Sequence, residues 1–201
     1  MTKDYISRDC DGFELNPIGF VSPGAQSSRY ISQIEEIAQK IVDAYGLNNL
    51  AFFFQGTCTE NGVYVFEAAA RMAGGSTFES ASILSNTEYM ENSIDCFLGN
   101  PQSFSMEKNE KFFEGRFLSM KPGIFSKLAA REELLAEGIL KKCWMFLREG
   151  TEITSSHSSS NRIAVAMSEG NTAEEASEKM ALALSRLAAL DENGIDCSDW
   201  K

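Results

Sequence analysis

The sequence predicts an α+β fold whose sheet is largely antiparallel. The first observation is a pair of apolar runs, 50–58 and 63–67, joined by a polar segment that ends in Asn61-Gly62. This pattern is typical of an antiparallel hairpin. The second observation is an amphipathic pattern before the hairpin, and the third is a capped helical pattern near the C-terminus. The chain shows neither an internal repeat nor a linker, so these elements are expected to share one architecture.

The N-terminal part of the chain combines an irregular segment with a helix. Residues 1–28 are interrupted by Pro17, Pro23 and Gly24, and they predict one short strand around 18–21. Apolar side chains then recur at intervals of three and four over residues 29–45, with Glu, Gln and Lys between them. This spacing predicts an amphipathic helix, and Gly46 is expected to end it.

The segment after the hairpin is predicted to alternate between helices and strands. Small residues at 68–75 indicate a turn, and residues 88–98 predict a helix that follows an irregular or helical stretch from Thr77. Residues 111–120 and 138–147 have the composition of strands.

The C-terminal part begins with a short predicted helix at 130–136, between those two strands. A Ser-rich segment, 149–161, predicts an exposed loop before a last strand at 162–167. Asn171 or Thr172 is expected to cap the final helix, with the Glu three residues on bonding back to the cap. The predicted buried stripe of this helix consists of Ala176, Met180, Ala183, Leu184, Leu187 and Leu190.

Composition limits the classes of function. The chain has 201 residues, of which 43% are hydrophobic, so it is long enough to build a core without disulfide or metal staples. Its net charge of -11 disfavours nucleic acid and anionic membrane surfaces as partners. The five cysteines are widely spread and form no CxxC pair, which favours reduced thiols in a cytoplasmic protein. No apolar stretch is long enough for a membrane span or a leader.

The chemistry-bearing residues cluster at the end of the hairpin. Gln55 ends the first apolar run, Glu67 closes the second, and Arg71 follows four residues later. A hairpin can bring the amide oxygen and the carboxylate side by side, as ligands suited to Mg²⁺. The guanidinium of Arg71 can bind phosphate oxygens. The spacing alone leaves an alternative open, in which Glu67 and Arg71 form a surface ion pair.

The helix, the strand ending in Gln55 and residues 62–75 resemble the C-terminal half of an ATP-grasp domain. In the carbamoyl-phosphate synthetase branch of that superfamily, a Gln and a Glu bind metal, and the second strand closes with a Glu-x-Asn-x-Arg motif. The resemblance implies ATP and Mg²⁺ as cofactors. It also implies Gln55 and Glu67 as metal ligands within the nucleotide site, and Arg71 as the phosphate-facing catalytic residue.

One position departs from this motif. Ala69 stands where the family has Asn, and its side chain cannot coordinate a metal. The departure leaves two alternatives: a ligase that holds its metal more weakly, or a non-catalytic descendant kept as an interaction or dimerisation module.

The C-terminal region resembles the small subdomain that follows the grasp fold in L-amino-acid ligases. The similarity covers residues 111–123 and 162–176. The expected organisation is therefore an irregular segment (1–28), the C-terminal half of an ATP-grasp domain (29–105) and a small α+β subdomain (106–201).

The resemblance implies a ligase that joins a small carboxylate to an amine through an acyl phosphate formed from ATP. The family also uses an N-terminal part that carries a lysine-bearing flap and the adenine pocket, which the first 28 residues are too short to hold. We therefore expect a fragment, a truncated homologue or one half of a split enzyme. Its expected partners are a missing N-terminal half or second subunit, with a homodimer as a further option.

Three other features are expected to be structural or peripheral. His157, the single histidine, lies in the Ser-rich loop and is expected to be solvated rather than part of a catalytic dyad. Arg116 is interpreted either as a ligand for a substrate carboxylate or as a charge at a sheet edge. The aromatic cluster of the hairpin is predicted to be core: Phe52, Phe53, Phe54 and Phe66.

Overall fold

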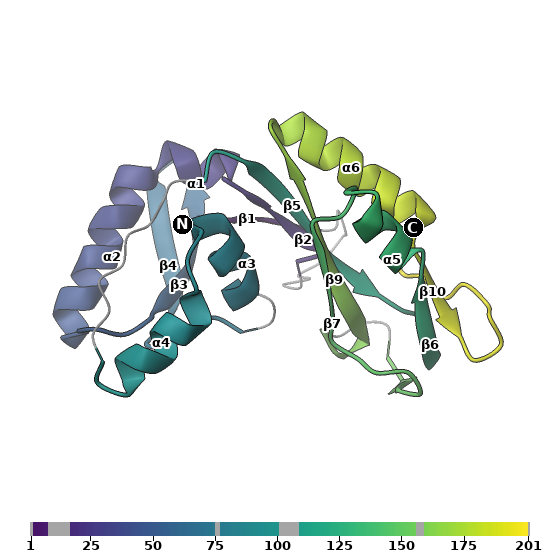
Figure 1. Cartoon of the computed structure of the whole chain (residues 1–201). Helices are drawn as coiled ribbons and strands as arrows, with labels where there is room; N and C mark the ends of the chain where they lie inside the picture. Colours follow the sequence, from purple (N-terminus) through teal and green to yellow (C-terminus); the bar gives the residue numbers. More distant parts are fainter. Residues whose placement is uncertain (1, 8–16, 75–76, 101–108, 156–158, 201) are drawn as a thin grey trace. The chain divides into compact units, whose positions relative to one another are not determined.

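The computed structural model of the chain describes residues 2–7, 17–74, 77–100, 109–155 and 159–200 (Figure 1). It divides into two compact units: unit 1 comprises Met1–Asp4 and Pro23–Asn109, and unit 2 comprises Tyr5–Ser22 and Glu110–Lys201. Both units combine helices with antiparallel strands, which confirms the predicted α+β class. None of the described helices is long and apolar enough to cross a membrane.

Unit 1 consists of helices and one hairpin. Its elements are α1 (Ala25–Arg29), α2 (Ile31–Tyr45), β3 (Phe53–Thr59), β4 (Gly62–Ala69), α3 (Thr77–Ser85) and α4 (Tyr89–Phe97). The amphipathic helix predicted at 29–45 is confirmed as α2, whereas α1 lies mostly in the segment 1–28 that was predicted to be irregular. Gly46 ends α2 with φ 60° and ψ 34°, a left-handed conformation that glycine adopts without steric cost. The predicted hairpin is confirmed as β3 and β4.

Unit 2 is built on two antiparallel sheets. A five-stranded sheet has the order β1-β2-β5-β9-β7, and a three-stranded sheet has the order β10-β6-β8. The strands of the first sheet are β1 (Asp4–Ile6), β2 (Gly19–Ser22), β5 (Phe112–Ser119), β9 (Arg162–Gly170) and β7 (Lys142–Met145). Those of the second are β10 (Ala188–Asp191), β6 (Gly123–Ala129) and β8 (Glu152–Ile153). Its helices are α5 (Arg131–Ala136), the 3₁₀ turn η1 (Ser159–Asn161) and α6 (Ala173–Arg186).

The end of α6 corrects one sequence prediction. Leu190 was expected in the buried stripe of the helix, but it lies in β10 and pairs with Lys127 of β6. The chain turns from helical to extended at Leu187, whose φ is -64° and ψ is 141°. Pairing with a distant strand therefore overrides the helical pattern. The start of α6 follows the prediction, because the Thr172 side chain accepts a hydrogen bond from the Glu175 amide at 3.1 Å.

The hydrophobic core lies in unit 2. A single cluster joins buried side chains from β5, β6, β7, β9, α5 and α6, and it includes Leu118, Phe125, Leu134, Met180 and Leu187. Among the described residues of unit 1, the buried apolar side chains are those of Ala81 and Cys96. The two units therefore differ sharply in how much apolar surface they bury by themselves.

Candidate functional site

The hairpin brings two of the predicted site residues together. Gln55 of β3 is the register partner of Glu67 of β4, so the two side chains start side by side on one face of the ribbon. Gln55 is partly buried and Glu67 is exposed. This geometry places an amide oxygen and a carboxylate next to each other, as the sequence predicts.

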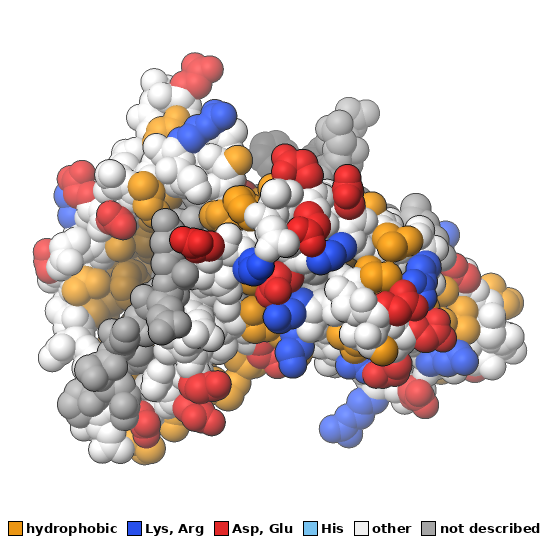
Figure 2. Space-filling view, turned by 45° about the horizontal axis from the view of Figure 1, so that its top comes forward, with side chains coloured by type: hydrophobic (Ala, Val, Ile, Leu, Met, Phe, Trp, Pro, Cys, Tyr) orange, Lys and Arg blue, Asp and Glu red, His pale blue; other side chains and the backbone are white. Residues whose placement is uncertain are grey.

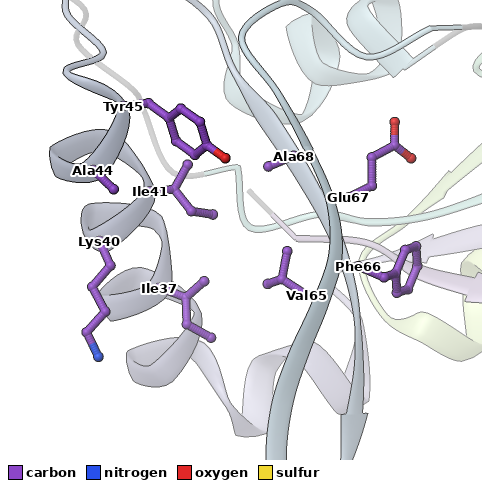
Figure 3. Close-up of a pocket in the computed structure, with 9 residues that line it drawn as sticks. All are labelled: Ile37, Lys40, Ile41, Ala44, Tyr45, Val65, Phe66, Glu67 and Ala68. Atoms are coloured by element: carbon purple, nitrogen blue, oxygen red, sulfur yellow. The ribbon is translucent and has the colours of Figure 1, made fainter.

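A β-bulge sets the direction of the Glu67 side chain. Gly56 pairs with Val65 while Gln55 pairs with Glu67, so Phe66 is an extra residue on β4. Val65 and Ala68 consequently point toward α2, whereas Phe66 and Glu67 point away from it (Figure 3).

The same bulge exposes an aromatic side chain. Phe66 was predicted to be core, and that prediction is wrong: its side chain is 71% exposed. The extra residue reverses the alternation of side chains at this point, which the apolar run itself does not reveal. The other three phenylalanines of the predicted cluster, Phe52, Phe53 and Phe54, are partly buried.

Arg71 lies beside this pair through a contact with the hairpin. Its guanidinium lies over the ring of Phe53, 4.9 Å from the ring centroid, and its Nη1 donates to the Met72 carbonyl at 2.8 Å. Phe53 is two residues from Gln55 along β3, so both project from the same face. In the described part of the chain no ion pair joins Glu67 to Arg71, so the alternative of a surface ion pair is not observed.

The donor set determines which metal environment the site can provide. Gln55 and Glu67 supply one amide oxygen and one carboxylate, while Ala69 pairs with Phe53 and supplies no ligand. Within the described ranges no group of three or more His, Cys, Asp or Glu could hold a metal ion. Two oxygen ligands fit Mg²⁺ that is held largely by nucleotide phosphates and water, rather than a cage made by protein alone.

A groove of about 380 Å³ lies between α2 and β4, and Phe66 and Glu67 are among the residues that line it (Figure 3). We call it the hairpin groove. Its apolar lining comes from Ile37, Ile41, Ala44, Val65 and Ala68. Lys40 also lines it, but its ammonium group pairs with the Glu36 carboxylate at 2.6 Å. The amphipathic pattern predicts the apolar face of α2, but it does not predict that none of the α2 residues is buried.

The remaining sequence candidates do not join the hairpin site. Arg116 lies on β5, which is flanked by β2 and β9, so the interpretation as a sheet-edge charge is wrong. Its Nε donates to the Glu114 carboxylate at 2.8 Å, and Glu114 is 5% exposed. His157 lies outside the described residues.

Sequence reasoning did not single out Lys3, whose pKa is lowered to about 8 because the side chain is buried. Its ammonium group donates to the Ser80 hydroxyl in unit 1. Ser80 is fully buried, so no substrate can reach the hydroxyl of this pair. An isolated lysine in a polar N-terminal segment gives no sequence signal of burial, and the contact is structural.

The sequence matches no protein-family model and no curated protein. Solved structures, however, resemble the chain along most of its length. The L-amino acid ligase from Bacillus licheniformis superposes with a TM-score of 0.76 at 17% identity, over 92% of this chain and 46% of the ligase. Phosphoribosylglycinamide synthetase from Anaerococcus prevotii gives 0.73 at 21% identity, over 88% of this chain and 46% of the enzyme.

A third structure carries a bound nucleotide. The biotin carboxylase domain of the Hydrogenobacter thermophilus 2-oxoglutarate carboxylase, a dimer in complex with MgADP, ADP and bicarbonate, matches 87% of this chain and 39% of its own length. Its TM-score is 0.66 at 13% identity. This chain thus spans less than half the length of each of these three solved proteins.

Proposed function

We propose that this chain, which has the fold of part of an ATP-grasp ligase, supplies the magnesium and phosphate side of the ATP site in a carbon–nitrogen ligase. The observation that carries the proposal is the hairpin register, which sets Gln55 beside Glu67. In the proposed reaction, a substrate carboxylate attacks the terminal phosphorus of ATP and releases ADP. An amine then attacks the acyl phosphate and displaces inorganic phosphate, forming the amide.

Each side chain has a distinct role in this proposal. The Glu67 carboxylate and the Gln55 amide oxygen bind the cation that accompanies the nucleotide, and Arg71 donates hydrogen bonds to phosphate oxygens. When bound, Mg²⁺ neutralises charge on the phosphates. Because one Arg71 donor is used by the Met72 carbonyl, the other N–H groups remain for phosphate. Phe53 limits the orientations of the guanidinium through their ring contact.

Binding of MgATP to the full chain tests the proposal. In NMR titrations with millimolar MgATP, we expect shifts that concentrate on the amides of β3 and β4 and that require Mg²⁺. Glu67→Gln should weaken this binding about tenfold or more, since it removes a charged ligand. Glu60→Gln is the matched control, because it makes the same charge change at the exposed turn of the same hairpin. Equal titrations of the Glu67 and Glu60 variants would overturn the assignment.

A second candidate function follows from Ala69. This position ends β4 without a polar side chain, which is compatible with a fold retained as an interaction or dimerisation module. That function predicts that MgATP leaves the hairpin amides unshifted, while association with another polypeptide is still measurable.

A further inference from the structure

We infer that the outer face of α4 in unit 1 is the docking surface for a basic amphipathic helix of another polypeptide. We call this face the α4 stripe, and it consists of the side chains of Met90, Ile94, Phe97 and Leu98. The inference does not depend on a nucleotide site at the hairpin, because it uses none of the residues of that site. It assigns an interaction surface and the chemistry of the partner that fits it.

The direction of the α4 side chains carries the first step. The side chains of the α4 stripe are 38–70% exposed, and they recur at intervals of three and four residues, so they lie on one face of the helix. The buried residues of α4 are instead Ser93 and Cys96. A helix of a globular protein normally turns its apolar face toward the core. A contiguous apolar face that points to solvent typically marks a site of contact with another molecule.

Hydrogen bonds hold the inward face of α4 in place. The Tyr89 amide donates to the Ser82 hydroxyl of α3 at 3.1 Å, and the Cys96 thiol donates to the Asn49 side-chain oxygen at 3.4 Å. Among the described elements, α4 packs chiefly against α3 (Figure 1). Rolling α4 so that its apolar side chains turn inward would break both hydrogen bonds. Unit 1 therefore does not cover the α4 stripe with its own elements.

An acidic row borders the α4 stripe on one side. Glu88, Glu91 and Asp95 recur at intervals of three and four, and on the helix they flank Leu98. Residues 72–107 include no Lys or Arg, so the sequence around α4 does not offset these charges. In the lower left of Figure 2, within the part that holds unit 1, hydrophobic and acidic side chains lie next to one another. The surface therefore combines apolar contact area with a negative potential.

The shape of the surface favours a helix as the partner. Met90, Ile94 and Leu98 are four residues apart, so they form a ridge that fits between the side-chain rows of a second helix. The backbone groups of a helix bond within it, so α4 has no open strand edge to which an extended peptide could add. The convex side of a helix also encloses no volume for a small ligand. The nine residues of α4 rise about 14 Å, which a partner helix of two to three turns covers.

The charge of the surface determines the kind of helix. Lys or Arg side chains beside the apolar face of the partner would pair with the acidic row, and such complementarity speeds association and excludes wrong partners. A second copy brings the same acidic row on a chain with a formal net charge of -11, so self-association through this face is disfavoured. An anionic membrane surface is disfavoured for the same reason. The occupant that fits is a basic amphipathic helix from a different polypeptide.

Site-specific photocrosslinking in the cells that naturally make the protein tests the inference. We would replace Phe97 with p-benzoylphenylalanine in the full chain and sequence the crosslinked peptides. Phe146, a 39% exposed aromatic residue of unit 2, is the matched control position. We expect position 97, and not position 146, to capture a segment of a different polypeptide with Lys or Arg beside apolar residues at intervals of three and four. Crosslinks to a second copy, crosslinks to a segment without this pattern, or no crosslink would each overturn the inference.

A charge variant tests the acidic row. The probe is the captured segment as a synthetic peptide, titrated into the full chain by calorimetry. Glu91→Lys should weaken binding about tenfold or more and reduce its dependence on salt, because it replaces an attractive charge with a repulsive one. Glu60→Lys makes the same change at the exposed turn of the hairpin and should leave the affinity unchanged. Equal weakening by the two variants would mean that only the overall charge attracts the peptide, and would reject the acidic row as its binding site.

A polar variant tests the α4 stripe itself. Ile94 is 49% exposed, so Ile94→Ser leaves no cavity in a core and should weaken binding of the same peptide about tenfold. Ile195→Ser, at a 60% exposed position of unit 2, is the matched control and should bind as the unmodified chain does. Equal affinities of the two variants would mean that the apolar side chains of α4 do not contact the peptide, and would overturn the inference.

Discussion

At the scale of residues, the direction of the Glu67 side chain is set by Gly56 and Phe66, which form the bulge and offer no metal ligand. Gly56 sits where an added Cβ would come within 2.6 Å of the Tyr64 carbonyl oxygen, so the bulge requires a residue without a side chain. Phe66 occupies the extra position and thereby turns Glu67 away from α2. The hairpin predicts that Gln55 and Glu67 lie near each other, but their direct pairing depends on the bulge, because the register from Thr59–Gly62 to Gly56–Val65 would otherwise place Gln55 opposite Phe66. The bulge could not be predicted, since an apolar run looks the same with or without an extra residue.

Glu175 provides a prediction for pH dependence. Its carboxylate pairs with the Lys179 ammonium group at 2.8 Å and accepts hydrogen bonds from the Asn171 backbone and side chain, which lower its pKa from 4.5 to about 2. Because the folded pKa lies below the unfolded one, the ionised carboxylate stabilises the fold fully above the unfolded value. This contribution is lost as pH falls through the folded pKa.

We therefore expect Glu175→Gln to be less stable than the unmodified chain at pH 6, with a difference that shrinks steadily as the pH is lowered toward 2. Urea unfolding at a series of pH values measures it. Glu178→Gln, on an exposed part of the same helix, is the control. A difference between Glu175→Gln and the unmodified chain that is independent of pH would contradict the pKa shift.

At the scale of elements, the sequence correctly predicted helix ends that are set by a capping residue. Gly46 ends α2 and Thr172 begins α6, as the sequence predicts. The strands β6, β8 and β10 were missed because each is defined by pairing with a distant segment. The pairing of Ala188 with Ala129 shows the reason, since the two residues are far apart in the chain and carry the same small side chain.

The hairpin bulge gives the prediction at this scale. Gly56→Ala should push the backbones of β3 and β4 apart, because the new methyl group meets backbone that cannot rotate away. We expect a loss of about 1–3 kcal/mol in the local stability of the hairpin, the usual cost of overpacking. Hydrogen exchange of the hairpin amides measures it. Gly74→Ala is the matched control, because a Cβ there meets nothing within 4 Å. Similar exchange in the two variants would mean that the bulge tolerates a side chain.

At the scale of the whole molecule, the sequence resemblance identified the fold although the overall identities are only 17–21% in the two structures with the highest TM-scores quoted above. Short motifs around Gln55 and Arg71 carried that resemblance. The scarcity of buried apolar side chains among the described residues of unit 1 was not predictable in the same way. The hydrophobic content of 43% is an average over the whole chain. It therefore does not predict that the buried apolar cluster lies in unit 2.

This uneven burial predicts that the two units differ in stability when the chain is studied alone. Amides of β9, which crosses the core of unit 2, should exchange far more slowly with solvent than those of α2. Met180→Ala removes a fully buried side chain and should cost about 2–5 kcal/mol. That cost corresponds to a fall of about 30-fold to 3,000-fold in the protection of β9 amides, at about 1.4 kcal/mol for each factor of ten.

The control for this prediction is Met90→Ala, the same substitution at a side chain that is 38% exposed on α4 of unit 1. It should leave the protection of β9 unchanged, because it creates no cavity in the core of unit 2. Met180→Ala should in turn leave the exchange of α2 unchanged, since an element without buried residues already opens without unfolding that core. If α2 and β9 instead lost protection together and by the same factor, the two units would unfold as one cooperative structure. The apolar surface of unit 1 would then need no partner to make it stable.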